Sequence, residues 1–375
     1  MKILITGGAG FIGSNLALAL IERGHTITVL DNLSPQIHGN DPKQSQLYLS
    51  IKDKVNFIEG CVTETKSWEE SIQDNEVIVH LAAETGTGQS MYDIEKYSTV
   101  NIHGTSLLLD YLTNKKNEVK KLVVASSRAI YGEGKYLHSK LGAVYPKQRL
   151  ETEMLLKKFD PTLSDFEPLT LVGTDENSQI HPTSFYGLTK QFQEQMVMTM
   201  CPTINISPVA FRYQNVYGPG QSLSNPYTGI LSIFSTQIRN NSNINIFEDG
   251  LESRDFVYIS DVVNATILGI EKEAANNEVF NVGTGIAINV QTVADKLIEN
   301  YQSKVKTNVT GQFRIGDIRH NYADLNKIKE KLGFTPKISF DEGMKSFVKW
   351  VLDQEIEDNL YNKAITEMAE KGLLK

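Results

Sequence analysis

Hydrophobic residues follow two alternating patterns along residues 1–212. Short runs of consecutive apolar residues alternate with longer stretches whose apolar positions recur at helical spacing. The short runs predict strands buried on both faces, and the longer stretches predict amphipathic helices. The predicted strands are 2–6, 26–30, 55–60, 76–81, 121–125 and 206–212, and the predicted helices are 14–23, 92–112 and 185–200. Strands that alternate with helices indicate an α/β fold with a doubly wound parallel sheet.

The alternation is interrupted between residues 133 and 181. This segment is polar, contains Pro146, Pro161 and Pro168, and shows one helical patch near 151–159. A segment of this length without a regular pattern is typical of a functional loop, a lid or an insertion. The pattern assigns no regular structure to the rest of it.

The pattern changes again beyond Gly218 and predicts a second, smaller lobe, because the loops lengthen and the elements shorten. The predicted helices are 227–239, 261–270, 290–300, 341–352 and 359–371, and the predicted strands are 244–247 and 279–281. We expect a Rossmann-like α/β domain at 1–200, to which the strand 206–212 returns. Residues 213–375 are expected to form mainly a smaller C-terminal α/β lobe.

Composition and charge exclude several classes of protein. The chain has 375 residues, of which 40% are hydrophobic and 22% charged, which is ordinary for a globular protein. A net charge of −8 leaves no basic excess for binding nucleic acid, and no apolar run approaches membrane-spanning length. Cys61 and Cys201 form neither a disulfide framework nor a metal-ligand cluster. We therefore expect a cytoplasmic protein without a bound metal and without a membrane or nucleic-acid partner.

A glycine turn near the N-terminus indicates a dinucleotide site. Gly7, Gly10 and Gly13 follow the first predicted strand and open the first predicted helix. Glycines at this spacing allow a tight turn and close approach of the backbone to a diphosphate, which the helix N-terminus then attracts. Asp31 ends the second strand, where an acid binds ribose hydroxyls, and this favours NAD over NADP. The alternative is a glycine-stabilised turn in another parallel α/β fold.

Tyr186 and Lys190 are the most informative pair of polar residues. Their spacing places both side chains on one face of the helix 185–200. A cation beside a phenol favours the phenolate, lowering its pKa by ~1–3 units. Ser126 and Ser127 follow the strand 121–125, at the edge where open α/β sheets bind ligands. Taken alone, Tyr186 and Lys190 could be an incidental pair on an exposed helix face. Ser126 and Ser127 alone could be a turn or a helix cap.

Taken together, these motifs resemble the extended short-chain dehydrogenase/reductase family, in its nucleotide-sugar epimerase/dehydratase branch. The match runs in family order from residue 3 to about 350. Its motifs are 6–13, His80-Leu81-Ala82-Ala83, Asn101, Ser127-x-x-x-Tyr131-Gly132, Tyr186-x-x-x-Lys190, 211–219, 254–257, 281–283 and Arg314-x-Gly316-Asp317.

The resemblance implies bound NAD and an NDP-sugar substrate in the cleft toward the C-terminal lobe. It makes Tyr186 the acid/base on the sugar 4-hydroxyl, Lys190 the ligand of the nicotinamide ribose, and Ser127 a hydrogen-bond partner of the same sugar oxygen. Asn215, Arg254, Arg314 and Asp317 are matched to the nucleotide diphosphate. The cofactor-binding positions carried over are Gly7, Gly10, Phe11, Ile12, Gly13, Asp31, Asn32, Leu81, Ala82, Ala83, Asn101, Ser126, Tyr186, Lys190 and Tyr213.

The type of reaction depends on the residues that follow Ser127. Related dehydratases and decarboxylases carry acidic residues there, whereas this chain has Arg128 and Ala129. The difference favours oxidation and re-reduction at C4, as in an epimerase. The chain departs from the family pattern at Cys61. Many family members have an acidic residue at this position after the third strand, where it contacts the adenine of the cofactor.

Two stretches, 83–91 and 316–320, are similar to dTDP-L-rhamnose 4-epimerases, which form dTDP-6-deoxy-L-talose. Thr85, Thr87 and Gln89 would then line the hexose pocket. The family resemblance also implies a homodimer formed through 92–112 and 185–200. The alternatives are a UDP-hexose 4-epimerase, an NAD(P)-dependent 4-keto-sugar reductase, and a non-catalytic dinucleotide-binding regulator. The last would be expected to lose Ser127, Tyr186 or Lys190, and all three are present.

Overall fold

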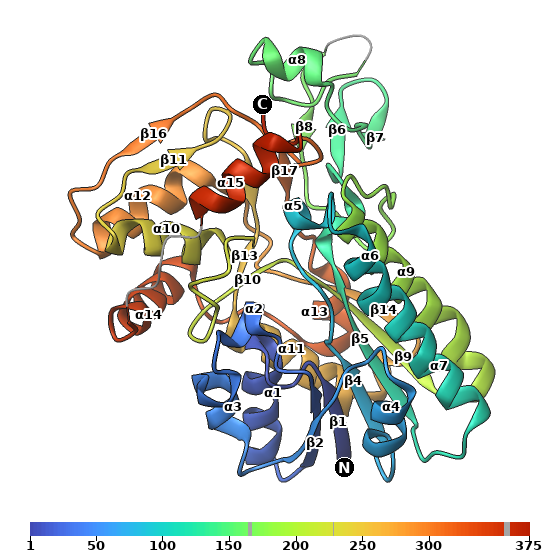
Figure 1. Ribbon diagram of the computed structural model, residues 1–375. Helices are drawn as coiled ribbons and strands as arrows, with labels where there is room; N and C mark the ends of the chain where they lie inside the picture. The colour runs from blue at the N-terminus through green and yellow to red at the C-terminus, as the bar shows by residue number, and fades with distance from the viewer. Residues whose placement is uncertain (164–166, 228, 356–360) are drawn as a thin grey trace.

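A seven-stranded parallel sheet forms the centre of the molecule, in a computed structural model that describes residues 1–163, 167–227, 229–355 and 361–375 (Figure 1). The order of the strands is β14-β9-β5-β4-β1-β2-β3. Their bounds are Lys2–Thr6 (β1), Thr26–Asp31 (β2), Asn56–Glu59 (β3), Val77–His80 (β4), Lys121–Ser127 (β5), Ser207–Tyr213 (β9) and Glu278–Val282 (β14). This confirms the predicted doubly wound sheet. The strand 279–281, predicted in the C-terminal lobe, is instead part of β14 and pairs with β9 at the edge of this sheet. The order reverses between β1 and β4, and ligands bind beside the carboxyl ends of strands at such a point.

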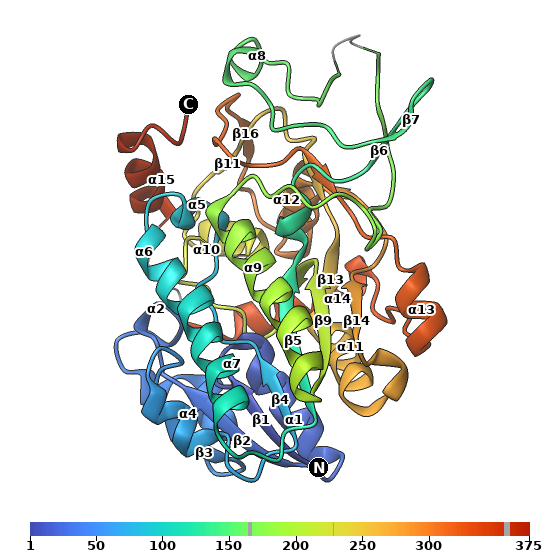
Figure 2. The same cartoon turned by 90° about the vertical axis from the view of Figure 1, so that its right-hand side faces the viewer.

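Helices cover both faces of the sheet, because alternate residues of each strand point to opposite sides. Ile3 and Ile5 pack with one group of helices, and Leu4 packs with the other. Figures 1 and 2 show α1 and α11 on one face and α4, α7 and α9 on the other. These helices are Phe11–Glu22 (α1), Thr65–Ser71 (α4), Gly104–Asn114 (α7), Phe185–Met200 (α9) and Ile259–Glu271 (α11).

The predicted helix 92–112 is wrong as one continuous element. It consists of α6 (Ile94–Tyr97), a π-helical segment (Ser98–His103) and α7. Wider π-helical turns occur frequently at functional sites. Here the segment carries Asn101, which is fully buried beneath the end of β4.

The C-terminal lobe has its own apolar core, formed mainly by Phe234, Phe256, Leu297 and Phe347. Its helices are Ile230–Arg239 (α10), Val290–Asn300 (α12), Phe340–Leu352 (α14) and Tyr361–Glu370 (α15), while Asn326–Leu332 (α13) packs on β14. Its strands are Asn215–Tyr217 (β10), Ile244–Ile246 (β11), Ser253–Arg254 (β12), Phe256–Tyr258 (β13), Ile288–Asn289 (β15), Thr307–Val309 (β16) and His320–Asn321 (β17). The start of the predicted helix 359–371 lies outside the described residues. The predicted helix 227–239 begins only at Ile230, after Gly229 at φ +74°.

The segment 133–181 contains more structure than the pattern predicted. Tyr136–His138 (β6), Gly142–Val144 (β7) and Thr170–Leu171 (β8) form an antiparallel sheet, and the helical patch shortens to Glu151–Leu155 (α8). Strands of two or three residues are too short to show a periodic pattern. The sequence also left out α4, α13 and the short helices Pro35–His38 (α2), Gln46–Ile51 (α3) and Thr87–Ser90 (α5). In the described part of the chain, no helix is long and apolar enough to cross a membrane.

Candidate active site

One cavity of about 440 Å³ runs from the glycine turn to the C-terminal lobe, along the carboxyl ends of the sheet strands. All predicted cofactor-binding residues except Asn101 line it. Of the residues predicted for the substrate, Thr85, Thr87, Ser127 and Asn215 line it as well. Gln89, Arg254, Arg314 and Asp317 are not among the described residues that line the cavity.

The glycine turn leaves no room for side chains. Gly7 has φ +66°, and a Cβ there would lie 2.9 Å from the backbone nitrogen of Ala82. A Cβ on Gly13 would lie 2.3 Å from the carbonyl oxygen of Gly7. No side chain caps the N-terminus of α1, whose first residues Phe11 and Ile12 line the cavity. The turn therefore presents unpaired backbone N–H groups at a helix N-terminus, which fits the diphosphate of a dinucleotide.

Asp31 is fixed by the backbone at the end of β2. Its carboxylate accepts hydrogen bonds from the backbone nitrogens of Ala9 at 2.9 Å and Leu33 at 2.8 Å. Burial raises the pKa of this carboxyl, and the backbone donors oppose that shift. Oδ1 also lies 3.9 Å from Nε2 of His38, which the sequence did not single out. Asp31 lines the cavity, and a carboxylate can accept more hydrogen bonds than these two, so the site suits ribose hydroxyls.

The predicted catalytic residues meet where the N-terminus of α9 contacts the end of β5. Gly187 makes this contact possible, since a Cβ there would lie 2.6 Å from the carbonyl oxygen of Ala129. The Ser184 hydroxyl caps the helix by accepting a hydrogen bond from the Gly187 N–H at 3.1 Å. As a result Tyr186 and Ser127 both line the cavity, and the Ser127 hydroxyl lowers the pKa of the Tyr186 phenol.

The positive charge that lowers the pKa of Tyr186 is that of Arg128 and not, as predicted, that of Lys190. The four-residue spacing predicted that Lys190 lowers the pKa of the phenol. Instead, Lys190 Nζ donates to the Ala125 carbonyl and to Gln193 Oε1, both at 2.9 Å, and burial lowers its own pKa to about 7. Burial raises the pKa of Tyr186, and the groups that lower it are the Ser127 hydroxyl and the charge of Arg128.

Asn101 supports the site from behind. Its amide donates to the Glu84 carbonyl at 3.1 Å and to Thr189 Oγ1 at 2.9 Å, and its oxygen accepts from the Glu84 N–H at 2.8 Å. It thereby ties the loop after β4 to the helix that carries Tyr186. We correct its predicted contact with the cofactor to a positioning role.

Ser126 is anchored by a buried ion pair. Its hydroxyl donates to Glu194 Oε2 at 2.5 Å, and Arg212 Nη2 donates to Glu194 Oε1 at 2.6 Å. Arg212 also donates to the Tyr131 hydroxyl at 2.7 Å. Glu194 and Arg212 are both only 4% exposed, so neither charge is compensated by solvent.

We expect Glu194→Ala to lower the free energy of unfolding by ~3–5 kcal/mol, because it leaves Arg212 as an uncompensated buried charge. Urea unfolding followed by circular dichroism measures this. Glu118→Ala, at an exposed position, is the control and should change stability by less than about 0.5 kcal/mol. Equal stability of the two variants would contradict the structural role of the pair.

Tyr97, which the sequence did not single out, supports the loop that was predicted to line the hexose pocket. Its hydroxyl donates to the Thr85 carbonyl at 2.6 Å, and its ring meets that of Tyr186 edge-on at 6.5 Å. Gln89 lies behind this loop, where its oxygen accepts from Gln36 at 3.0 Å and from Tyr97 at 3.3 Å. The prediction that Gln89 lines the pocket is therefore wrong, whereas Thr85 and Thr87 do line it.

The two arginines matched to the diphosphate share one carboxylate; Arg254 is buried, whereas Arg314 is partly exposed. Asp317 accepts from Arg254 at 2.9 Å and from Arg314 at 2.6 Å, and these arginines hold the pKa of its carboxyl well below its usual range. Arg254 also donates to the carbonyls of Ser253, Ile318 and Arg319. Both arginines thus have internal partners in this arrangement, and a direct contact with phosphate stays a prediction.

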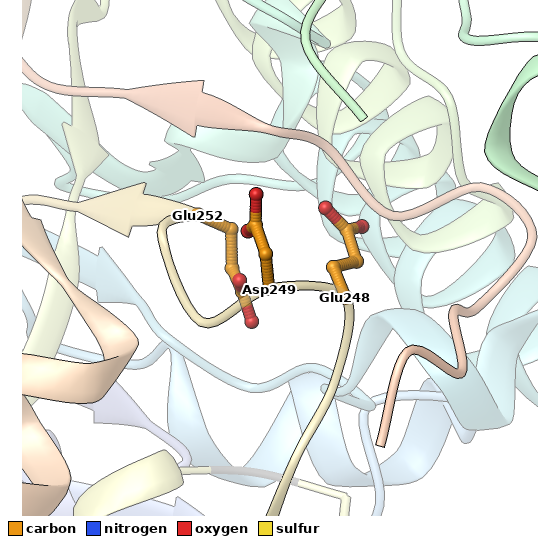
Figure 3. Close-up of side chains that lie close together, drawn as sticks. All are labelled: Glu248, Asp249 and Glu252. Atoms are coloured by element: carbon orange, nitrogen blue, oxygen red, sulfur yellow. The ribbon is translucent and has the colours of Figure 1, made fainter. Parts of the chain in front are cut away.

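Figure 3 shows three carboxylates, Glu248, Asp249 and Glu252, on the turn between β11 and β12. The guanidinium of Arg319 lies 3.0 Å from Glu248, 2.6 Å from Asp249 and 3.9 Å from Glu252. Arg149 binds Glu248 at 2.8 Å from the other side. The carboxylates therefore have arginine counter-ions, and the cluster joins segment 133–181 to the C-terminal lobe.

The C-terminal helix α15 is attached at the mouth of the cavity by a tyrosine–carboxylate contact. Glu367 accepts from the hydroxyls of Tyr227 at 2.7 Å and Tyr92 at 3.2 Å. Tyr227 lines the cavity. The contact thus connects α15 to the wall of the site.

We expect Glu367→Ala to speed amide hydrogen exchange in 361–370 by about tenfold, because it removes two hydrogen bonds that fix the helix. Mass spectrometry of exchanged peptides measures this. Glu370→Ala, an exposed substitution on the same helix, is the matched control. Unchanged exchange in the Glu367 variant would show that α15 is held by other contacts.

The chain is similar to known proteins over nearly its whole length. The family model "NAD dependent epimerase/dehydratase family" matches residues 3–158 and 164–283. A dTDP-L-rhamnose 4-epimerase of Burkholderia thailandensis is 36% identical, with 94% of this chain and 95% of that protein covered. The structure of the UDP-glucose 4-epimerase of Thermotoga maritima with UDP-glucose is 31% identical, with a TM-score of 0.74 and 94% and 99% of the chains covered. The UDP-glucuronic acid 4-epimerase of Bacillus cereus, solved with UDP-glucuronic acid and NAD, is 25% identical, with a TM-score of 0.75 and the same coverage.

Proposed function

Because the chain belongs to the NAD-dependent epimerase/dehydratase family, we propose that it is a nucleotide-sugar 4-epimerase that works with bound NAD. The observation that carries the proposal is the meeting of Ser127 and Tyr186 in the cavity that also contains the glycine turn. Residues 1–200 with the returning strand β9 would hold NAD, and 213–375 would hold most of the sugar nucleotide. Arg128 and Ala129 supply no carboxylate for eliminating water or carbon dioxide, which favours epimerisation.

In this proposal Tyr186 moves the proton of the sugar 4-hydroxyl. When bound, NAD supplies the oxidant that accepts hydride from C4 and later returns it. Tyr186 removes the proton of the 4-hydroxyl as the hydride leaves and gives a proton back to the same oxygen on re-reduction. Ser127 would hydrogen-bond that oxygen, and Lys190 and Asp31 would hold the two riboses. The 4-keto sugar would turn in the site between oxidation and re-reduction, which would present the other face of C4.

We propose dTDP-L-rhamnose as the substrate and dTDP-6-deoxy-L-talose as the product. The similarity to the Burkholderia thailandensis enzyme supports this, as does the position of Thr85 and Thr87 in the cavity wall. A UDP-hexose substrate is the second candidate, because the structurally similar Thermotoga maritima enzyme is a UDP-glucose 4-epimerase.

The test is incubation of the purified protein with a panel of dTDP- and UDP-hexoses, followed by separation of the product sugars. An epimerase interconverts its pair of sugars with no net change in nicotinamide absorbance. Consumption of added NADH or NADPH with a 4-keto sugar would instead establish a reductase. Tight NAD binding without conversion of any sugar would favour a regulator.

We further propose a cytoplasmic homodimer that associates through α7 and α9. Leu188, Phe192 and Met200 lie along α9 with exposed fractions of 36%, 43% and 38%. Exposed apolar residues gathered on one helix are typical of a protein interface. Sedimentation equilibrium tests this, and Phe192→Asp should shift a dimer toward monomer.

A further inference from the structure

Arg128 is a polar residue of the cavity to which neither the glycine turn nor the proposed proton transfer assigns a role. It begins the 3-10 turn Arg128–Tyr131 directly after Ser127. Its side chain lines the cavity, and Nε donates to Asn215 Oδ1 at 2.9 Å. The two terminal nitrogens of its guanidinium make no hydrogen bond to any residue that the structure describes. Two donor groups of the fork are therefore available to a ligand.

The charge of Arg128 has no carboxylate partner of its own. Burial and the neighbouring Arg254 lower its pKa to about 9, so it remains a cation at neutral pH. Asp317, whose charge also acts on Arg128, is already shared by Arg254 and Arg314. Within the described residues, no carboxylate forms an ion pair with Arg128. A half-buried cation without a partner is stabilised by an anionic ligand.

Arg128 lies between the two ends of the proposed substrate. It lines the same cavity as Tyr186, which would act on the sugar, and its charge lowers the pKa of that phenol. It also bonds Asn215 and lies near Arg254, both matched to the diphosphate. A planar guanidinium binds phosphate oxygens in pairs, whereas an ammonium does not.

The other polar groups around Tyr186 do not supply a comparable positive charge. Lys190, on the same helix, directs its ammonium to Ala125 and Gln193. From α6, Tyr97 presents an uncharged phenol whose pKa is raised by burial and by Glu84. From α5, Ser90 accepts the backbone N–H of Tyr186 at 2.9 Å. Ser127 contributes a hydrogen bond and no charge.

We propose that Arg128 is a substrate-positioning residue whose guanidinium, oriented by Asn215, donates to the substrate diphosphate while its charge favours the phenolate of Tyr186. This deepens the proposed function and rests on it for the identity of the substrate. The effect on Tyr186 and the contact with the diphosphate have different chemical requirements. The effect on Tyr186 needs only a positive charge, whereas the diphosphate contact needs the fork of an arginine.

The experiment compares wild type with Arg128→Lys, Arg128→Gln and the surface control Arg23→Gln, all loaded with NAD. The titration of Tyr186 is read from ultraviolet absorbance as the difference between each protein and its Tyr186→Phe counterpart. The dissociation constants of dTDP and UDP are measured by calorimetry. Neither measurement requires turnover, so both remain informative if the sugar panel gives no product and the proposed function fails.

Arg128→Gln should raise the pKa of Tyr186 by about one unit or more. It should also raise the dissociation constants of dTDP and UDP by about tenfold. In Arg128→Lys, Tyr186 should titrate as in the wild type, but most of the affinity for dTDP and UDP should be lost. The ratio of dTDP to UDP affinity should stay constant, because the contact is to phosphate and not to the base. A wild-type titration or a wild-type affinity in Arg128→Gln would overturn the proposal.

Discussion

Tyr186→Phe should lower epimerase turnover by about a thousandfold or more and leave NAD bound. In the proposed mechanism this hydroxyl exchanges the proton with the sugar, and neither Ser127 nor Lys190 is expected to replace it. Ser127 lacks a base, and Lys190 is engaged by Ala125 and Gln193. The substitution keeps the ring and its edge-on contact with Tyr97, so the fold should not change.

Product formation with the best sugar of the panel measures this effect, and the absorbance of released cofactor measures the NAD content. Tyr111→Phe is the matched control, because Tyr111 lies on α7 as a partly buried side chain of the apolar core. It should retain wild-type turnover. Activity of Tyr186→Phe within tenfold of wild type would remove Tyr186 from the proposed chemistry.

Asp31→Ala should weaken NAD binding by about one hundredfold, since a hydrogen bond to a carboxylate contributes ~1.5–3 kcal/mol. The expected loss has two parts. The ribose loses its acceptor, and the backbone N–H groups of Ala9 and Leu33 lose theirs, which loosens the turn around the diphosphate.

Calorimetric titration of the protein freed of NAD measures the affinity, and the melting temperature of the same sample separates binding from folding. Asp53→Ala, at a nearby exposed position, should leave both values unchanged. An unaltered NAD affinity in Asp31→Ala would show that the carboxylate does not contact the ribose.

The sequence predicted the central sheet and the glycine turn because both rest on local patterns. Fully buried strands such as β4 and β5 require consecutive apolar residues, and such runs can be recognised in the sequence itself. A position such as Gly13, where a Cβ would lie 2.3 Å from a backbone oxygen, accepts no other residue. The short strands β6, β7 and β8 were missed because two or three residues carry no measurable period.

The sequence by itself therefore determined the sheet, the dinucleotide cradle and the chemical types of the residues at the strand ends. Only the tertiary structure decided which of these groups act on one another. It turned Lys190 toward the Ala125 carbonyl and Asn101 behind the cavity, and it placed Arg128 beside Asn215 and Tyr186. Spacing along a helix specifies which face a side chain occupies, but the hydrogen-bond partner that orients it comes from a distant segment. The electrostatics of the site consequently depend on contacts between β5, α9 and β10, which no local pattern contains.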